Sequence, residues 1–308
     1  MERIKGNILI TGCNGFIGKG FIKEYSHKYK IIGVDKIKEI QKIKNYKEYN
    51  IDICNLVEIE KILLEDKITC IIHTAAEKSL INCEENKEIA YKINYETTMK
   101  LAELSKKYNI KFIFISSDQV FDGKFGNYKE NSETNAINYY GQLKIMVEEK
   151  LKSLNRCAIC RTALVIGSIP NEQKEYFDSI KMQSELAVQG FIVQQVQFCL
   201  KNNLKIHLPA DEFVSPTHIK LLAKQLDIII EKDLTGIFHC SGNDCISRYQ
   251  MGKMIASKYK LNDMYIDGSE GTNPLRPKNV SLNCEYTENK FGIKFSSFEE
   301  MLKEYDYD

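Results

Sequence analysis

Three glycines, each three residues from the next, interrupt the chain near its N-terminus in the segment Thr11-Gly12-Cys13-Asn14-Gly15-Phe16-Ile17-Gly18. An apolar run, residues 7–11, precedes this turn, and an amphipathic stretch from about 15 to 27 follows it. Glycine permits positive φ and close approach of a ligand to the backbone, while a helix N-terminus offers N–H groups to phosphate. A strand, a glycine turn and a helix in this order are typical of a βαβ unit that binds a dinucleotide. We predict that the turn binds the dinucleotide through Gly12, Asn14, Gly15, Phe16, Ile17 and Gly18.

The rest of the first half alternates short apolar runs with helical periodicity. We expect further strands at residues 31–34, 49–53, 69–73, 111–116 and 158–166, and helices at about 86–108 and 140–151. Unbroken apolar strands that alternate with helices indicate a parallel sheet covered on both faces. Right-handed crossovers then give a doubly wound α/β, Rossmann-like fold.

The pattern loosens after about Gly167. We expect helices near residues 191–201, 220–232 and 247–259, with Ser247 as an N-cap, a short strand at 236–240 and a loop-helix insertion at 168–190. The prediction is a nucleotide-binding domain, 1–167, that also carries the catalytic groups, and a smaller mixed α/β lobe, 168–308, that mainly binds substrate. The two are expected to be interleaved and tightly packed rather than independent.

Composition excludes several classes of function. Lys plus Arg number 43 against 42 Asp plus Glu, and no basic stripe argues for nucleic acid. No apolar run approaches the roughly 18–20 residues that a membrane helix needs, and the N-terminus leads directly into a predicted strand, without a signal peptide. Ten scattered cysteines indicate reduced thiols in a cytoplasmic protein. Cys157 and Cys160 are predicted to point to opposite faces of a strand, and no second pair completes a metal site.

Acidic residues lie at the ends of the second and third predicted strands. Asp35 is placed to bind the adenosine ribose 2′-OH, which favours NAD, whereas the adjacent Lys36 could meet a 2′-phosphate. An ordinary surface pair is the alternative, so the choice between NADPH and NADH stays open. Asp52 and Ile53 are expected to cover the adenine, although Asp52 fits a helix N-cap or a turn equally well.

Three side chains are candidates for chemistry. Ser117 follows the fifth strand, at the edge where doubly wound sheets bind ligands, and Tyr140 and Lys144 share one face of the next helix. We expect Tyr140 to donate a proton to a carbonyl oxygen as hydride reaches its carbon, Lys144 to lower the Tyr140 pKa and hold the nicotinamide ribose, and Ser117 to donate a hydrogen bond to the same oxygen. An exposed helix pair is the alternative for Tyr140 and Lys144. Tyr139 has leucine, not lysine, four residues on.

These residues resemble the extended short-chain dehydrogenase/reductase superfamily and, within it, the dTDP-4-dehydrorhamnose reductase family. The resemblance runs nearly end to end, and it is carried by Ile71-Ile72-His73-Thr74-Ala75-Ala76, Cys83-Glu84-Glu85, Ala90-Tyr91-Lys92-Ile93-Asn94, Phe114-Ile115-Ser116-Ser117-Asp118-Gln119-Val120-Phe121-Asp122-Gly123, Ser215-Pro216-Thr217, Gly236-Ile237-Phe238-His239-Cys240-Ser241-Gly242 and Arg276-Pro277. It implies catalytic roles for Ser117, Tyr140 and Lys144, a cofactor-site role for Asn94, and a place along the cofactor for Ala75 and Ala76. It also implies reduction of the C4 ketone of a nucleotide-linked 6-deoxy sugar with NADPH or NADH, the last step to dTDP-L-rhamnose. The implied partners are a nucleotide-sugar substrate and, as one option, a second copy of the chain in a homodimer.

Some positions depart from that family and keep other functions open. Gln119 replaces the usual aromatic residue, Ala136-Ile137-Asn138 replaces a Pro-Leu-Asn approach to the tyrosine, and the stretch after Gly167 is longer than expected. Epimerisation would reuse the same tyrosine and lysine, whereas 4,6-dehydration is disfavoured because Gln119 cannot act as an acid or base. The chain also resembles the regulatory β subunit of methionine adenosyltransferase, through Ser241-Gly242-Asn243 up to Met251 and through Arg276-Pro277-Lys278-Asn279. That resemblance implies a nucleotide-binding partner subunit instead of an enzyme.

Overall fold

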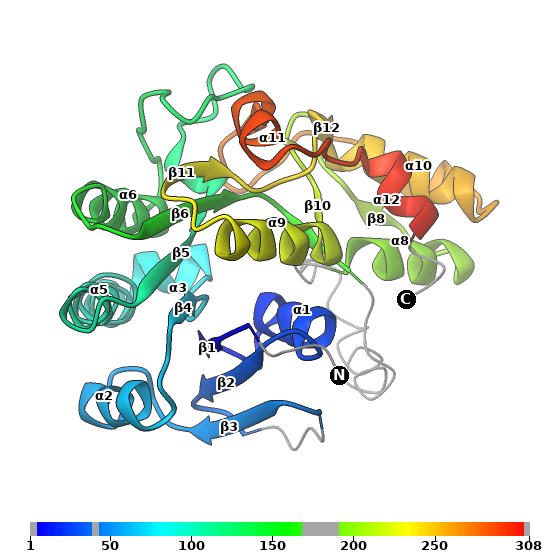
Figure 1. Ribbon diagram of the computed structural model, residues 1–308. Coiled ribbons are helices and arrows are strands. Elements are labelled where there is room, and N and C mark those ends of the chain that lie inside the picture. The colour runs from blue at the N-terminus through cyan, green and yellow to red at the C-terminus, as the bar shows by residue number, and fades with distance from the viewer. Residues whose placement is uncertain (1–4, 39–42, 168–190, 305–308) are drawn as a thin grey trace.

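A computed structural model describes residues 5–38, 43–167 and 191–304 (Figure 1). Its centre is a seven-stranded sheet in the order β11-β6-β5-β4-β1-β2-β3, in which every neighbouring pair is parallel. The strands are β1 (Asn7–Thr11), β2 (Lys30–Asp35), β3 (Tyr46–Asn50), β4 (Cys70–His73), β5 (Lys111–Ser117), β6 (Cys157–Thr162) and β11 (Gly236–His239). The predicted doubly wound α/β fold is confirmed.

Helices cover both faces of this sheet (Figure 1). One face packs against α2 (Leu56–Glu65), α5 (Thr98–Lys107) and α6 (Tyr139–Leu151), and the other against α1 (Phe16–Tyr25), α9 (Ile219–Glu231) and α11 (Glu285–Phe291). Successive residues of a strand point to opposite faces, so Ile71 and Ile72 of β4 enter different core clusters. Burial on both faces explains why the central strands are continuous apolar runs.

Three predicted elements differ from the observed ones. The predicted helix 86–108 is helical but divided into α4 (Lys87–Tyr91), a π-helical turn (Lys92–Thr97) and α5. The predicted strand 49–53 is observed earlier in the sequence, as β3. The prediction missed its start because this edge strand is partly exposed and lacks an apolar run. The predicted strand 158–166 is broken after β6, and its last residues form β7 (Val165–Ile166). We did not predict α2 or the short helix α3 (Leu80–Glu85).

The second half builds a smaller group of elements beside the sheet (Figure 1). It contains α8 (Ile192–Lys201), α10 (Arg248–Lys258), α12 (Phe298–Glu304) and the short strands β8 (Ile206–His207), β9 (Phe213–Val214), β10 (Thr217–His218), β12 (Ile246–Ser247) and β13 (Ile266–Asp267). Ser247 caps α10 as predicted, since its hydroxyl accepts the Gln250 N–H at 3.1 Å. The predicted insertion at 168–190 lies outside the described residues. Because β11 joins the main sheet beside β6, the two halves share one sheet, and the proposed boundary at 167 stays a prediction.

All ten cysteines are free thiols, and Cys157 and Cys160 enter opposite core clusters, as their strand spacing predicts. Within the described ranges, no group of three or more His, Cys, Asp or Glu side chains could hold a metal ion. No helix among those residues has both the length and the apolar character needed to cross a membrane.

Candidate active site

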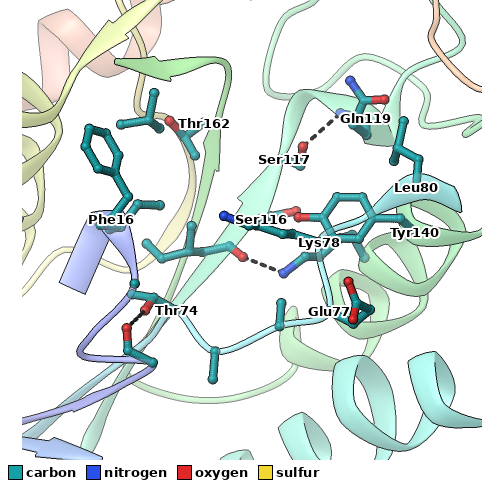
Figure 2. Close-up of a pocket in the computed structure, with 18 of the residues that line it drawn as sticks. Phe16, Thr74, Glu77, Lys78, Leu80, Ser116, Ser117, Gln119, Tyr140 and Thr162 are labelled. Carbon is teal, nitrogen blue, oxygen red and sulfur yellow. Dashed lines mark hydrogen bonds between the residues drawn. The ribbon is translucent and has the colours of Figure 1, made fainter. Parts of the chain in front are cut away.

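A cavity of about 420 Å³ opens at the carboxyl ends of the parallel strands. It extends from the β1–α1 turn, at Gly12 and Gly15, to Tyr140 and Lys144 on α6. Figure 2 shows Phe16 and Thr162 toward one side of this space and Ser117, Gln119 and Tyr140 toward the other. The cavity therefore brings the predicted dinucleotide turn and the predicted chemical groups into a single site.

The glycines of the turn have two different structural roles. Gly12 has φ +70°, and a Cβ there would lie 2.9 Å from the Ala75 backbone, so a side chain would collide with the cavity wall. Gly15, Phe16 and Ile17 line the cavity with it. Gly18 lies behind the wall, where a Cβ would come within 2.7 Å of the Cys13 backbone, and it allows α1 to pack closely on the turn. The remaining predicted residue, the half-buried Asn14, is absent from the described lining, and its side-chain amide joins the turn to neighbouring segments by donating to the Ile37 carbonyl and the Glu48 carboxylate.

Asp35 fastens the end of β2 to this turn. Its carboxylate accepts the backbone N–H groups of Asn14 and Ile37, each at 3.1 Å, and it lines the cavity together with Lys36. Asp52 and Ile53 also line the cavity, but from the loop after β3 and not from the strand itself. The Asp52 carboxylate accepts the Cys54 N–H at 2.8 Å, and this hydrogen bond lowers the pKa of Asp52. Asp52 thus has the turn role that its position suggested, beside the cavity.

The opposite wall follows β4 through Thr74, Ala75 and Ala76. The Thr74 hydroxyl donates to the Thr11 carbonyl at 2.7 Å and so joins the wall to β1. Asn94 is buried behind this wall, in the π-helical turn, where its side chain bonds the backbone of Glu77. Asn94 therefore positions the wall, and the structure places it behind the cavity lining.

The site has the properties that a dinucleotide requires. Several lining positions at the turn and on the facing wall are small: Gly12 and Gly15 carry no side chain, and Ala75 and Ala76 carry only a methyl group. Within the described helix α1, the first turn holds no acidic residue and its N-cap, Gly15, supplies no side-chain hydrogen bond. The helix N–H groups and the positive end of its dipole thus stay available to a phosphate.

Ser117, Tyr140 and Lys144 line the cavity together. Ser117 is the last residue of β5, and Tyr140 lies in the first turn of α6. Lys144 is buried one helical turn later, where its ammonium donates to the Ile115 carbonyl at 2.8 Å and lies 5.5 Å from the Tyr140 ring centroid. Burial lowers the pKa of Lys144 to about 8, and the nearby Glu148 carboxylate opposes this effect.

The pKa of Tyr140 differs from the expectation drawn from the sequence. We expected Lys144 to lower it, but removal from water raises the pKa of Tyr140, and the charges of Asp118 and Cys83 raise it further. Hydrogen bonding between Tyr140 and the Ser117 hydroxyl acts in the opposite direction. Desolvation has the largest effect on the pKa because a charged phenolate is less stable where protein displaces the water around it. Tyr140 is accordingly a protonated phenol in this structure, which is the form a proton donor needs.

The cavity lining also contains charged residues, of which Glu212 and Arg248 were not singled out from the sequence. Asp118 and Glu212 are almost fully buried, and Arg248 lies close to Glu212, with 3.4 Å between Nε and a carboxylate oxygen. Burial lowers the pKa of Arg248 to about 10. Arg276 and Gln119 also line the cavity. The Arg276-Pro277 motif was visible in the sequence, whereas Glu212 and Arg248 meet only through tertiary packing.

The chain is similar to known proteins over most of its length. The family model described as the RmlD substrate binding domain matches residues 6–306. The chain is 27% identical over 315 residues to dTDP-4-dehydrorhamnose reductase of Aggregatibacter actinomycetemcomitans, which covers 96% of this chain and 97% of the relative. It is 26% identical over 296 residues to methionine adenosyltransferase 2 subunit beta of Xenopus laevis, which covers 92% and 82%.

A similar solved structure is that of dTDP-4-dehydrorhamnose reductase from Bacillus anthracis str. Ames in complex with NADP. It matches with a TM-score of 0.82 at 25% sequence identity, over 98% of this chain and 99% of the other. The similarity thus extends over the sheet and over the smaller group of elements beside it.

Proposed function

Because the chain belongs to the RmlD substrate-binding domain family, we propose that it is an oxidoreductase that reduces a nucleotide-linked 4-keto-6-deoxy sugar with NADPH or NADH. dTDP-4-dehydrorhamnose, reduced to dTDP-L-rhamnose, is the first substrate to test. One observation carries this proposal: Ser117, Tyr140 and Lys144 line the same cavity as the glycine turn. An exposed tyrosine–lysine pair on a helix surface would not lie there.

Some residues of the cavity would bind the cofactor, and others would transfer a proton or stabilise charge. The glycine turn and the N-terminus of α1 would hold the cofactor phosphates, and Lys144 the nicotinamide ribose. When bound, a reduced nicotinamide supplies a hydride to the substrate carbonyl carbon. Tyr140 then donates its phenolic proton to the carbonyl oxygen, and Ser117 stabilises the charge that develops on that oxygen.

The electrostatics of the pair support this direction of proton transfer. Surrounding protein keeps Tyr140 protonated before the reaction, and the Lys144 ammonium lies close enough to stabilise negative charge when the proton leaves. A group that stabilises charge only as it develops lowers the barrier more than it lowers the ground state. The pair therefore favours the transition state of reduction.

Both nicotinamide cofactors remain in the proposal. The Bacillus anthracis reductase is in complex with NADP, and the exposed Lys36 could meet a 2′-phosphate. Asp35, which could bind a 2′-hydroxyl, already accepts two backbone N–H groups. A cytoplasmic location, which rests on the reduced cysteines, and a homodimer, which rests on the family resemblance, are further proposals.

A second function is a non-catalytic, nucleotide-binding subunit. The similarity to methionine adenosyltransferase 2 subunit beta over 92% of this chain favours it. Such a subunit needs the glycine turn but gains nothing from a complete set of Ser117, Tyr140 and Lys144. The intact set makes the reductase our first choice.

One experiment separates the two functions. Purified protein is mixed with dTDP-4-dehydrorhamnose and NADPH or NADH, and cofactor oxidation is followed by absorbance. A reductase consumes cofactor only when the sugar is present, and its preference between the cofactors reports on Asp35 and Lys36. Tight cofactor binding without consumption, together with capture of a methionine adenosyltransferase catalytic subunit, would contradict the proposal.

A further inference from the structure

The Ser117 side chain is hydrogen-bonded to the two residues that follow it in the chain. Its hydroxyl oxygen accepts the Gln119 backbone N–H at 3.2 Å, an interaction visible in Figure 2. Its hydroxyl group lies 2.9 Å from Oδ1 of Asp118, which also accepts a hydrogen bond from the Gln119 side-chain amide at 3.2 Å. The candidate oxyanion donor is therefore already engaged with a buried carboxyl group.

A second link fixes this group to the catalytic helix. The buried Asn138 caps α6 by accepting the Gly141 N–H at 2.8 Å, and its amide donates to the Gln119 side chain at 3.1 Å. The same amide donates to the Leu275 carbonyl at 2.9 Å, beside Arg276. The Gln119 side chain thus accepts a hydrogen bond from Asn138 and donates one to Asp118.

The hydroxyl of Ser117 has one proton to give. When Asp118 is ionised, its carboxylate can only accept, so the Ser117 proton is committed to Asp118 and unavailable to a ligand. When Asp118 carries a proton, the carboxylic O–H donates to the Ser117 oxygen, and the Ser117 O–H is released toward the cavity. The two states differ by one proton on Asp118 and by the direction of one hydrogen bond.

The surroundings of Asp118 allow this change near neutral pH. Burial raises the pKa of Asp118 to about 6, although hydrogen bonds from its neighbours and the positive charges of Arg248 and Arg276 oppose the rise. Tyr140 faces it from α6, and Glu212 lies beside Arg248 and reduces the effect of that guanidinium. Both protonation states are therefore accessible within the range where most enzymes are assayed.

We propose that Asp118 is a positioning residue whose protonation decides whether the Ser117 hydroxyl can donate to the substrate carbonyl oxygen. Gln119 and Asn138 hold Asp118 in the geometry that this requires. The inference rests on the proposed reductase function, because it concerns the oxygen that is reduced. It assigns to Asp118 a role that acts through Ser117, without contact with the reacting atoms.

The test combines a titration without substrate and a pH profile with it. Protein with carbon-13 labelled aspartate carboxyls is titrated by NMR, and kcat/KM for sugar reduction is measured between pH 5 and pH 8. We expect one carboxyl resonance to titrate near pH 6 and kcat/KM to fall by up to about 10²-fold as it ionises, because one donor to the oxyanion is lost. Asp118→Asn should remove both that resonance and that step in the profile, while the control Asp122→Asn, on a carboxylate bonded to Tyr128, should keep both.

A second variant keeps the test informative if Asp118→Asn does not fold. Gln119→Leu removes a donor to the carboxylate, so the NMR midpoint and the step in the profile should both move to higher pH. A profile that keeps its step in Asp118→Asn, or a midpoint that Gln119→Leu leaves unchanged, would overturn the role of Asp118. A carboxyl that titrates as expected in a protein that reduces no 4-keto sugar would instead overturn the proposed function.

Discussion

Asn94 binds both backbone polar groups of Glu77. Its side-chain oxygen accepts the Glu77 N–H at 2.8 Å, and its amide nitrogen donates to the Glu77 carbonyl at 2.9 Å. The pair joins the π-helical turn to the loop that follows β4, which forms one wall of the cavity. A buried side chain with two such bonds fixes the position of that loop relative to the helix.

Asn94→Ala should destabilise the fold and weaken cofactor binding. The change leaves the part-buried Glu77 N–H without its side-chain acceptor and the Glu77 carbonyl with only the Cys83 thiol, at a cost of about 1–3 kcal/mol. Urea unfolding measures the first effect and calorimetric titration with NADPH the second. Asn262→Ala, which removes a cap from an exposed 3₁₀ turn, is the matched control and should leave cofactor affinity unchanged. Equal behaviour of the two variants would argue against the role assigned to Asn94.

Tyr140→Phe should lower kcat by about 10²- to 10⁴-fold, because the proton donor is lost while the ring remains. Cofactor affinity, measured by calorimetry, should change little. Tyr139→Phe is the neighbouring control. The Tyr139 ring packs beside the Lys87 ammonium and is not among the described residues that line the cavity, so activity should stay near that of the wild type. Turnover of Tyr140→Phe at the wild-type rate would rule out its assignment as the acid.

Gly15→Val should abolish cofactor binding without unfolding the protein. Among the described residues beyond its chain neighbours and its own helix, a Cβ at Gly15 would contact only the Gly12 carbonyl, at 3.1 Å, and the larger side chain would occupy the space beside the N-terminus of α1. Calorimetric titration with NADPH and NADH measures the loss, and the unfolding midpoint without cofactor is the control. Unchanged affinity in a folded variant would show that the phosphates bind elsewhere.

Local sequence patterns predicted most of the fold. In the elements near the site, the local residue pattern favours the same secondary structure that the folded protein adopts. The strand β1 has the predicted bounds, and α6 begins one residue earlier than predicted. Errors arose where tertiary context decides: β3 is a polar edge strand, and the π-helical turn at Lys92–Thr97 has the same apolar periodicity as an α-helix over a few residues. The helix α2 was missed although Asn55 caps it and its apolar residues have helical spacing.

The candidate site was predictable only in part. Motif spacing identified the glycine turn, Tyr140 and Lys144, and one cavity is lined by Gly12, Gly15, Tyr140 and Lys144. The raised pKa of Tyr140 could not be read from sequence, because it depends on how much water the folded protein displaces. The link from Asn138 to Gln119 joins residues 19 apart through side chains whose contact exists only after folding.

Stability should decrease as the pH falls from 7 to 5. Burial lowers the pKa of His73 and of His239 to about 3 and that of His218 to about 4, whereas an unfolded histidine titrates near 6.5. The unfolded chain therefore binds protons first, and each histidine removes about 2 kcal/mol of stability across this interval. Asp118 acts in the opposite direction, because its pKa is raised in the folded state. Urea unfolding at both pH values gives the net effect, and equal stability at the two values would contradict it.

The most direct test of the central claim follows the hydride itself. The protein is incubated with dTDP-4-dehydrorhamnose and nicotinamide cofactor deuterated at the transferable position, and the sugar product is analysed by NMR and mass spectrometry. The account predicts one deuterium on C4 of the sugar in the wild type and about 10²- to 10⁴-fold slower incorporation in Tyr140→Phe. Product without deuterium, or bound cofactor that never transfers it to any nucleotide-linked 4-keto sugar, would contradict the reductase function.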